Sequence, residues 1–320
     1  MAGTLLVSLD FELFWGMLDK CRLEDYQDNV LGARTAIPKM LDLFQKYDIH
    51  ATWAAVGFLF AENYQELKRY FPEQKPSYQQ KDLSPYDWFD RIGEDENSAP
   101  CFYCPGLIRL VSQVPGQEIG SHTFSHYYCR EPGQTVEQFA ADMAAAKRIT
   151  ADHGYDLTSV ILPRNQCEPE YTEVLRQCGF TAYRDEENDW IHQKIKIRPL
   201  MRLLRLADAY LPLTGQGGYM PACEDGIWNL IGSRAFKAVS RSRKPLEGLK
   251  VRRIKGQMRH AAKKGLTFHL WWHPHNMGDL TEEFFSQLED VLQYYARLRE
   301  EYGMESLNMR EAAEKEEAKL

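Results

Sequence analysis

The chain has 320 residues, with 39 Lys and Arg against 46 Asp and Glu, a net charge of −7, and 44% of its residues are hydrophobic. This apolar content excludes a predominantly disordered chain, and the acidic balance argues against an ordinary nucleic-acid-binding protein. A chain of this length can bury a large core, either as one elaborated domain or as two. Its longest apolar run, Trp53–Phe60, is far shorter than the roughly 20 residues that span a bilayer.

The first residues and the cysteines predict a cytoplasmic protein. Met1–Leu9 runs directly into Asp10 and Glu12, without the basic region and apolar core of a signal peptide. The seven cysteines are odd in number and irregularly spaced, which favours free thiols in a reducing compartment.

Short apolar runs alternate with longer amphipathic segments along the chain. The predicted strands are Thr4–Leu9, Ala51–Phe58, Gln117–Ser121, Ser159–Leu162, Thr181–Tyr183, Leu266–Trp272 and Glu305–Asn308. The predicted helices are Thr35–Tyr47, Gly106–Gln113, Thr135–His153, Glu170–Cys178 and Glu282–Tyr302, the third opening with a Thr135/Gln138 capping box. The alternation predicts a parallel sheet, open or closed into a barrel. The charged run Glu311–Lys319 predicts a frayed, solvated helix.

Two stretches interrupt this alternation and are interpreted as insertions. Ala61–Pro105 is polar and rich in Pro and Tyr. Ile195–His260 becomes strongly basic, and Lys237–Lys264 holds 11 Lys and Arg against one Glu. Such charge attracts an anionic substrate or the inner membrane surface. The alternative interpretation is a solvated basic helix that balances an acidic body.

Polar side chains follow two of the predicted strands. Asp10 and Glu12 are two apart at the end of the first strand, so both side chains point the same way. His122 and His126 follow the third strand and would meet on one face of a helical turn, a spacing suited to one metal ion. Solvated carboxylates and satisfied imidazoles are the alternatives at these positions.

Two further strands end in candidate groups. Arg164 follows the fourth barrel strand, where its guanidinium would hold a carboxylate by bidentate contact. His269, Trp271 and His273 share one face of Leu266–Trp272 and its continuation, and one of these His is a candidate general acid. Aromatic packing is the rival role for His269.

Four motifs in this order resemble the polysaccharide deacetylase superfamily: S-L-D-F-E, E-I-G-S-H-T-F-S-H, P-R-N-Q and W-W-H-P-H. The resemblance covers most of Met1–Ile191 and Leu266–Glu311 and leaves both insertions unmatched. It implies an α/β fold, a distorted (β/α) barrel of about seven parallel strands, formed by residues 1–320 as one domain with insertions at about 61–105 and 195–260. It also implies a hydrolase that removes N-acetyl groups, chiefly from amino sugars, with one divalent metal ion held by an acidic residue and two His.

Transferred residue by residue, the resemblance makes His122 and His126 metal ligands. The family's usual pair of adjacent Asp is replaced here by Asp10 and Glu12, with Phe11 between them. Asp10 is assigned as the general base and Glu12 as the third ligand, and the exchanged assignment is the alternative.

The remaining site residues also follow from the resemblance. Arg164 resembles the arginine that orders the base, although its proline precedes it. His273 matches the general acid, with His275 as the alternative. The residues expected to contact the substrate are Trp15, Asn165, Trp272 and His275.

The resemblance implies Zn²⁺ as the cofactor, with Co²⁺, Ni²⁺ or Mn²⁺ as alternatives. The expected partner is an acetylated amino sugar, free or linked to a nucleotide or a lipid diphosphate; nucleic acid is not expected. Residues 237–264 are a candidate for peripheral membrane contact, and no oligomeric state is predicted. The rival functions are an amidohydrolase acting on a small non-sugar amide and a non-catalytic barrel for glycan binding or scaffolding.

Overall fold

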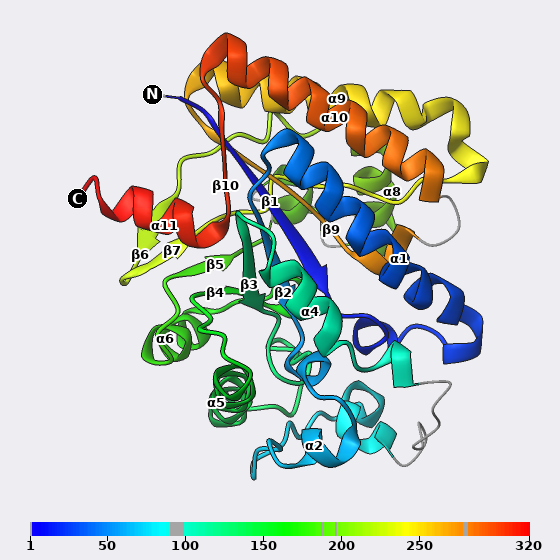
Figure 1. The fold of residues 1–320 in the computed structure, drawn as a ribbon, viewed down its shortest axis with the longest axis vertical. Coiled ribbons are helices and arrows are strands. Elements are labelled where there is room, and N and C mark those ends of the chain that lie inside the picture. The colour runs from blue at the N-terminus through cyan, green and yellow to red at the C-terminus, as the bar shows by residue number, and fades with distance from the viewer. Residues whose placement is uncertain (1, 90–98, 187–188, 196, 278–280) are drawn as a thin grey trace.

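The computed structural model describes residues 2–89, 99–186, 189–195, 197–277 and 281–320, and its centre is a ring of parallel strands surrounded by helices (Figure 1). Among these residues, no helix has the combined length and hydrophobicity that crossing a bilayer requires.

Strand β1 (Thr4–Phe11) is the centre of the sheet, and all eight of its residues are buried. It runs parallel to β2 (Ala51–Ala55) on one side and to β9 (Thr267–Trp272) on the other. Beyond β2 the sheet continues through β3 (Gln117–Ser121), β4 (Ser159–Ile161) and β5 (Ala182–Arg184), all parallel. Apolar and branched residues on both faces suit strands that are covered on both sides.

The ring closes through a segment that the sequence analysis did not predict. β7 (Ile227–Asn229) pairs with β5, and β8 (Arg234–Ala235), a few residues later, pairs with β9. Between them, Gly232 N donates to the Asp185 carbonyl and Ser233 N donates to the His269 carbonyl. Residues 227–235 therefore occupy one strand position of the barrel, between β5 and β9. The predicted α/β barrel of about seven parallel strands is confirmed.

Helices cover the outside of the ring (Figure 1). Their bounds are α1 (Leu23–Tyr47), α4 (Pro105–Ser112), α5 (Val136–Asp152), α6 (Pro169–Gln177), α9 (Glu247–Lys264) and α10 (Thr281–Tyr302). The capping box of Thr135 and Gln138 opens α5 as predicted. α1 begins twelve residues before the predicted start at Thr35, and Pro38 lies inside it, with Ile37, Met40 and Phe44 buried against the barrel.

The C-terminal segment differs from its prediction. β10 (Glu305–Leu307) pairs with β1, and α11 (Met309–Glu317) buries Met309, Ala312 and Ala313. The predicted frayed, solvated helix is therefore wrong. Asn308 and Glu311 form a capping box that starts the helix, and the Met309 amide donates to the Thr52 hydroxyl of β2, which ties the helix to the barrel.

The two insertions contain mainly short elements. The first holds α2 (Tyr64–Lys68) and packs its aromatic rings around Phe58, which also contacts Trp15. The second holds α7 (Trp190–Lys194), α8 (Arg198–Asp208) and β6 (Ala222–Glu224), which is antiparallel to β7. The 3-10 helices of the described residues are short: η1 (Trp15–Met17), η2 (Gly57–Phe60), η3 (Lys81–Leu83), η4 (Pro85–Trp88), η5 (Ala99–Cys101), η6 (Pro163–Asn165), η7 (Arg241–Leu246) and η8 (Pro274–Met277).

Candidate active site

Charged and imidazole side chains meet at the carboxyl end of the barrel, where β-strands of this architecture place their functional groups. Asp10 lies near the end of β1, and Glu12 follows that strand. His122 follows β3, Arg184 ends β5, and His273 follows β9. Side-chain ion-pair distances of 2.8 to 3.6 Å link these groups to the two carboxylates.

The backbone after β1 folds the Glu12 side chain into the site. Leu13 has φ +47°, a left-handed conformation that turns the chain away from the strand direction. Gly16 then passes so close that a Cβ at that position would lie 2.0 Å from Cδ of Glu12. Only glycine leaves room for the carboxylate here, which is 2% exposed.

A strained loop, and not the helical turn that the spacing suggested, holds His122 and His126. Thr123 and His126 both have positive φ values, +65° and +57°. Buried Asp142 of α5 accepts hydrogen bonds from the amides of Phe124 and Ser125 and from the Ser125 hydroxyl. These bonds fix the loop, so both imidazoles point inward, with ring centroids 5.1 Å apart.

Both imidazoles face one carboxylate oxygen. Nε2 of His122 lies 3.2 Å and Nε2 of His126 lies 2.9 Å from Oε2 of Glu12. These three residues form a group of potential metal-ligand atoms that lie within 4.8 Å of one another. Burial lowers the pKa of His126 to about 4, although Glu12 opposes the shift, so the ring is neutral and keeps a lone pair for a cation.

Asp10 is held by an arginine that the sequence analysis did not select. Nη2 of Arg184 donates to Oδ2 of Asp10 over 2.8 Å, and both side chains are buried. Burial raises the pKa of Asp10, but the charges of Arg184 and of the nearby imidazoles outweigh burial and hold this pKa below its ordinary value. The other oxygen, Oδ1, is buried without a hydrogen-bond partner.

The Arg184 guanidinium is fixed on three further sides. Nε donates to Oδ1 of Asn165, and Nη1 donates to the Ser8 hydroxyl. The Trp271 ring lies 4.4 Å from the guanidinium carbon. Burial lowers the pKa of His269 to about 3, and this neutral ring lies 2.7 Å from the Ser8 hydroxyl. His269 therefore belongs to a buried polar network, a role that the sequence analysis did not foresee.

Arg164 does not contact Asp10, which corrects its assignment as the residue that orders the base. Its guanidinium forms ion pairs with Asp19 and Glu131 and lies over the Tyr128 ring. Arg164 has φ +59°, and this backbone conformation directs its side chain to those partners, where it is about one third exposed. Arg184 could have been selected from the sequence by the same criterion as Arg164, because it is also a cation at the carboxyl end of a strand.

The two arginines give a matched pair of substitutions. We expect Arg184→Met to lower the free energy of unfolding by about 3–5 kcal/mol, because it leaves the Asp10 carboxylate buried without its partner. Arg164→Met removes two part-exposed ion pairs and should cost about 1 kcal/mol or less. Urea unfolding of both variants measures the difference, and equal losses would contradict the contrast between the two sites.

His273 and His275 lie on the side of Glu12 opposite the His122/His126 pair. Nε2 of His273 is 3.5 Å and Nε2 of His275 is 3.6 Å from Oε1 of Glu12. The His273 side chain is 26% exposed, whereas that of His275 is 1% exposed. Burial lowers the pKa of His275 to about 3. Only His273 of these two is therefore open to a substrate.

Two of the expected substrate contacts are wrong. Trp15 is 1% exposed and packs in the core against Phe58 and Phe102. Trp272 is also buried, because alternate residues of β9 face opposite sides and its ring points outward between the barrel and α10. Trp271, one residue earlier, points into the site and is partly exposed.

Asn165 and His275 lie at the site, but in supporting positions. The Asn165 side chain accepts from Arg184, and Asn165 is 9% exposed. The His275 ring packs edge-on against Tyr26, whose hydroxyl donates to Asn276. These side chains contact site residues, and their low exposure leaves little surface for a substrate.

The donor set fits a divalent metal ion. One carboxylate and two imidazole nitrogens are the ligands that zinc and similar ions take in catalytic sites, with a position left for water. Oε1 of Glu12 is buried without a hydrogen-bond partner, and the imidazoles of His122 and His126 flank its other oxygen. A bound cation would satisfy all three ligand atoms.

A sequence model of a known family matches residues 25–183, and its description is polysaccharide deacetylase. The chain contains a polysaccharide deacetylase domain. The resemblance that the four motifs indicated is thereby confirmed. The match includes His122 and His126 but begins after Glu12 and ends before Arg184 and His273. No curated protein sequence matches the chain.

Solved structures share the fold of this deacetylase domain. A candidate polysaccharide deacetylase from Mycobacterium smegmatis has a TM-score of 0.64 at 12% identity, over 100% of this chain and 92% of that one. A second, from Pseudomonas aeruginosa PAO1, has a TM-score of 0.57 at 12% identity, over 97% and 89%. The Puue allantoinase has a TM-score of 0.58 at 12% identity, over 97% and 88%. At such low identity these structures establish the fold alone.

Proposed function

We propose that the protein is a metal-dependent hydrolase that removes the acetyl group from an N-acetylated amino sugar. The observation that carries the proposal is the convergence of Glu12, His122 and His126 beside Asp10, whose Oδ1 has no hydrogen-bond partner. The polysaccharide deacetylase match supports a glycan as the substrate.

Glu12, His122 and His126 would hold the metal ion. A divalent ion bound there supplies Lewis-acid chemistry, which makes water more acidic and polarises an amide carbonyl. Zinc suits one carboxylate and two imidazoles, and Co²⁺, Ni²⁺ and Mn²⁺ are the alternatives.

The chain's own residues move the protons of the reaction. Oδ1 of Asp10 accepts a proton from the attacking water, while Oδ2 stays bound to Arg184, which fixes the direction of the carboxylate. His273 gives a proton to the departing amine as the C–N bond breaks, which yields acetate and a free amino group. Its partial exposure lets it reach a substrate that enters from solvent.

The substrate is proposed to be a cytoplasmic glycan precursor, linked to a nucleotide or to a lipid diphosphate. The irregular, odd set of cysteines favours a reducing compartment, where such precursors are soluble or membrane-bound intermediates. We further propose that residues 1–320 form one domain, because residues 227–235 of the second insertion complete the barrel itself.

Acetate release from a panel of N-acetylated amino sugars, their nucleotide derivatives and small amides tests the proposal. The expected result is metal-dependent acetate release from at least one sugar. His122→Ala should reduce both metal content and activity to below about one tenth of wild type, because one of three ligands is lost. His153→Ala is the matched control, since His153 pairs with Glu66 away from the site.

The panel also separates the rival functions. The allantoinase that shares this fold justifies including allantoin among the small amides. If the protein hydrolyses a small amide and no sugar, its substrate is a small amide and not a glycan. A metal-loaded protein that releases acetate from no substrate would overturn the hydrolase and leave a non-catalytic barrel.

A further inference from the structure

The second insertion leaves its large apolar side chains exposed to solvent. Eleven large apolar residues are exposed among the described residues, and nine of them lie between residues 190 and 249. They are Trp190, Ile197, Leu200, Leu203, Leu211, Leu213, Met220, Leu246 and Leu249. Single exposed apolar side chains are ordinary, but such a concentration in one segment marks an interaction surface.

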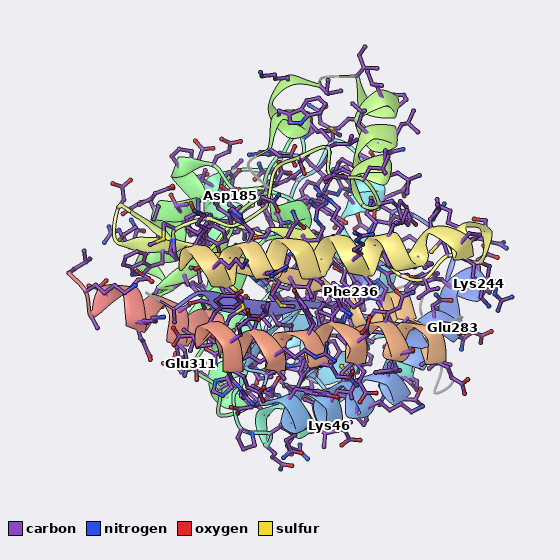
Figure 2. All side chains as sticks on the ribbon, turned by 90° about the horizontal axis from the view of Figure 1, so that it is seen from above. Lys46, Asp185, Phe236, Lys244, Glu283 and Glu311 are labelled. Atoms are coloured by element: carbon purple, nitrogen blue, oxygen red, sulfur yellow. The ribbon has the colours of Figure 1, made fainter. Side chains whose placement is uncertain are left out.

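Helix α8 is the most distinctly amphipathic element of this insertion. Leu200, Leu203 and Leu204 recur at the spacing of one helix face, whereas Arg202 and Arg205 lie on another. Leu203 is 62% exposed, so the apolar face is not covered by the barrel. In Figure 2 the yellow-green helix α8 projects beyond α9, on the side away from α10.

A groove continues this apolar surface toward α9. It has a volume of about 350 Å³, and Leu211, Pro212 and Leu249 line it together with Arg252. The Arg243 side chain donates to the Tyr210 hydroxyl, which fastens the 3-10 turn before α9 to the end of α8. Leu211 of the loop after α8 and Leu249 of α9 therefore line one groove.

The segment that carries these leucines is strongly basic. Residues 190–256 contain fourteen Lys and Arg and only four Asp and Glu. Two of the acids are neutralised inside the protein: Asp208 pairs with Arg234 and Arg253, and Glu247 pairs with Lys250. The other two, Glu224 and Asp225, lie in the β6–β7 hairpin, at the opposite edge of the molecule from α8 in Figure 1.

Several exposed cations of this segment therefore have no ion-pair partner in the described part of the chain. Among the described residues, Arg202, Arg241, Lys244 and Arg252 are exposed and form no ion pair. Lys244 is labelled in Figure 2 at the end of α9 that lies farthest from α11. Exposed leucines with uncompensated arginines and lysines are the composition of elements that lie in the headgroup layer of a membrane.

We infer that this surface docks on a bilayer that contains anionic phospholipids. We call it the α8 face, defined by Ile197, Leu200, Leu203, Leu211, Leu213, Leu246 and Leu249 with Arg241, Lys244 and Arg252. The leucines enter the boundary between headgroups and acyl chains, and the cations attract the anionic headgroups. A second copy of the chain is a poorer occupant, because the same face would bring like charges together.

The α8 face differs from the basic segment 237–264 that the sequence suggested. Lys250 and Arg253 of that segment are buried in ion pairs, and Lys255 pairs with Asp290 of α10. The cations in the middle of α9 therefore have a structural role. The contact surface instead takes its cations from η7 and from the first turns of α9.

Sedimentation of the full chain with lipid vesicles tests this inference. The expected result is binding to phosphatidylcholine vesicles that contain about 30 mol% phosphatidylglycerol, weak binding to phosphatidylcholine alone, and release by about 0.5 M NaCl. The double variant L200E/L203E should bind at least about tenfold more weakly, and R241E/K244E should lose about fivefold or more for each cation replaced.

Matched substitutions elsewhere control for general effects. Leu110→Glu changes an exposed leucine on α4, and K68E/R69E reverses two exposed cations at α2; both should bind vesicles as wild type does. Deacetylation of a soluble sugar should stay unchanged in L200E/L203E, so failure of docking and failure of the proposed function are separable. Docking is overturned if anionic vesicles are not bound, if L200E/L203E binds normally, or if light scattering shows a dimer that L203E dissociates.

Discussion

Replacing Asp10 with Asn is expected to lower kcat by about 10³-fold, which is within the range that a positioned general base contributes. The amide cannot take the proton that Oδ1 of the carboxylate accepts. Its oxygen can still accept the hydrogen bond from Arg184, so the side chain keeps its direction. Metal content should stay at the wild-type level, because the ligands are Glu12, His122 and His126.

Asp19→Asn is the matched control for this substitution. Asp19 also pairs with an arginine, Arg164, and contacts none of the metal-ligand group in the described structure. It should leave kcat within about twofold of wild type, as expected for a part-exposed ion pair. Steady-state kinetics and metal analysis of the variants distinguish the outcomes. If Asp10→Asn loses its metal, Asp10 is the ligand and Glu12 is the base. If Asp10→Asn keeps the wild-type kcat, Asp10 is not the general base.

Replacing Gly16 with Ala is expected to weaken metal binding by about 100-fold, the upper range for residues that support metal ligands. A methyl group there would lie 2.0 Å from Cδ of Glu12 and 2.5 Å from Oε2, so the carboxylate must leave its position between the imidazoles. Competition with a chromogenic chelator measures the change in dissociation constant.

Gly106→Ala controls for the general effect of adding a methyl group to a glycine. A Cβ at Gly106, in α4, would meet nothing within 4 Å, and alanine should stabilise this helix by up to about 1 kcal/mol. Unchanged metal affinity in Gly16→Ala, with wild-type stability, would show that Glu12 is not a ligand in its present position.

Local sequence patterns were sufficient to predict those helices and strands whose bounds depend on their own residues alone. Gln117–Ser121 is a strand with the predicted bounds, and α5 begins at the predicted capping box. The seventh barrel position was missed, because β7 and β8 are three and two residues long and Gly232 separates them. Only their hydrogen bonds to β5 and β9 make them part of the sheet, and such long-range pairing leaves no periodic pattern in the sequence.

The sequence predicted the site residues that directly follow a strand. It missed those whose role depends on which way the side chain points. Glu12, His122 and His126 come together as the strand ends suggested. Arg164 follows the end of β4 and Arg184 is the last residue of β5, so both lie at the carboxyl ends of strands, but the left-handed backbone at Arg164 turns its side chain away. The choice of Trp272 over Trp271 was likewise an error of one residue in a strand whose faces alternate.

The barrel has two thin seams: β3 and β4 share one residue pair, and the short strands of residues 227–235 close the other side. β1 is joined to β9 by six residue pairs and to β2 by five, whereas β7 meets β5, and β8 meets β9, through two pairs each. Amide hydrogen exchange should therefore begin beside Gly232, which packs against Trp271 and Arg184, and between β3 and β4, while β1, which carries Asp10, stays protected. Local opening of the ring would therefore reach both sides of the catalytic mouth: the arginine side beside Gly232, and the histidine side at β3, which leads into His122.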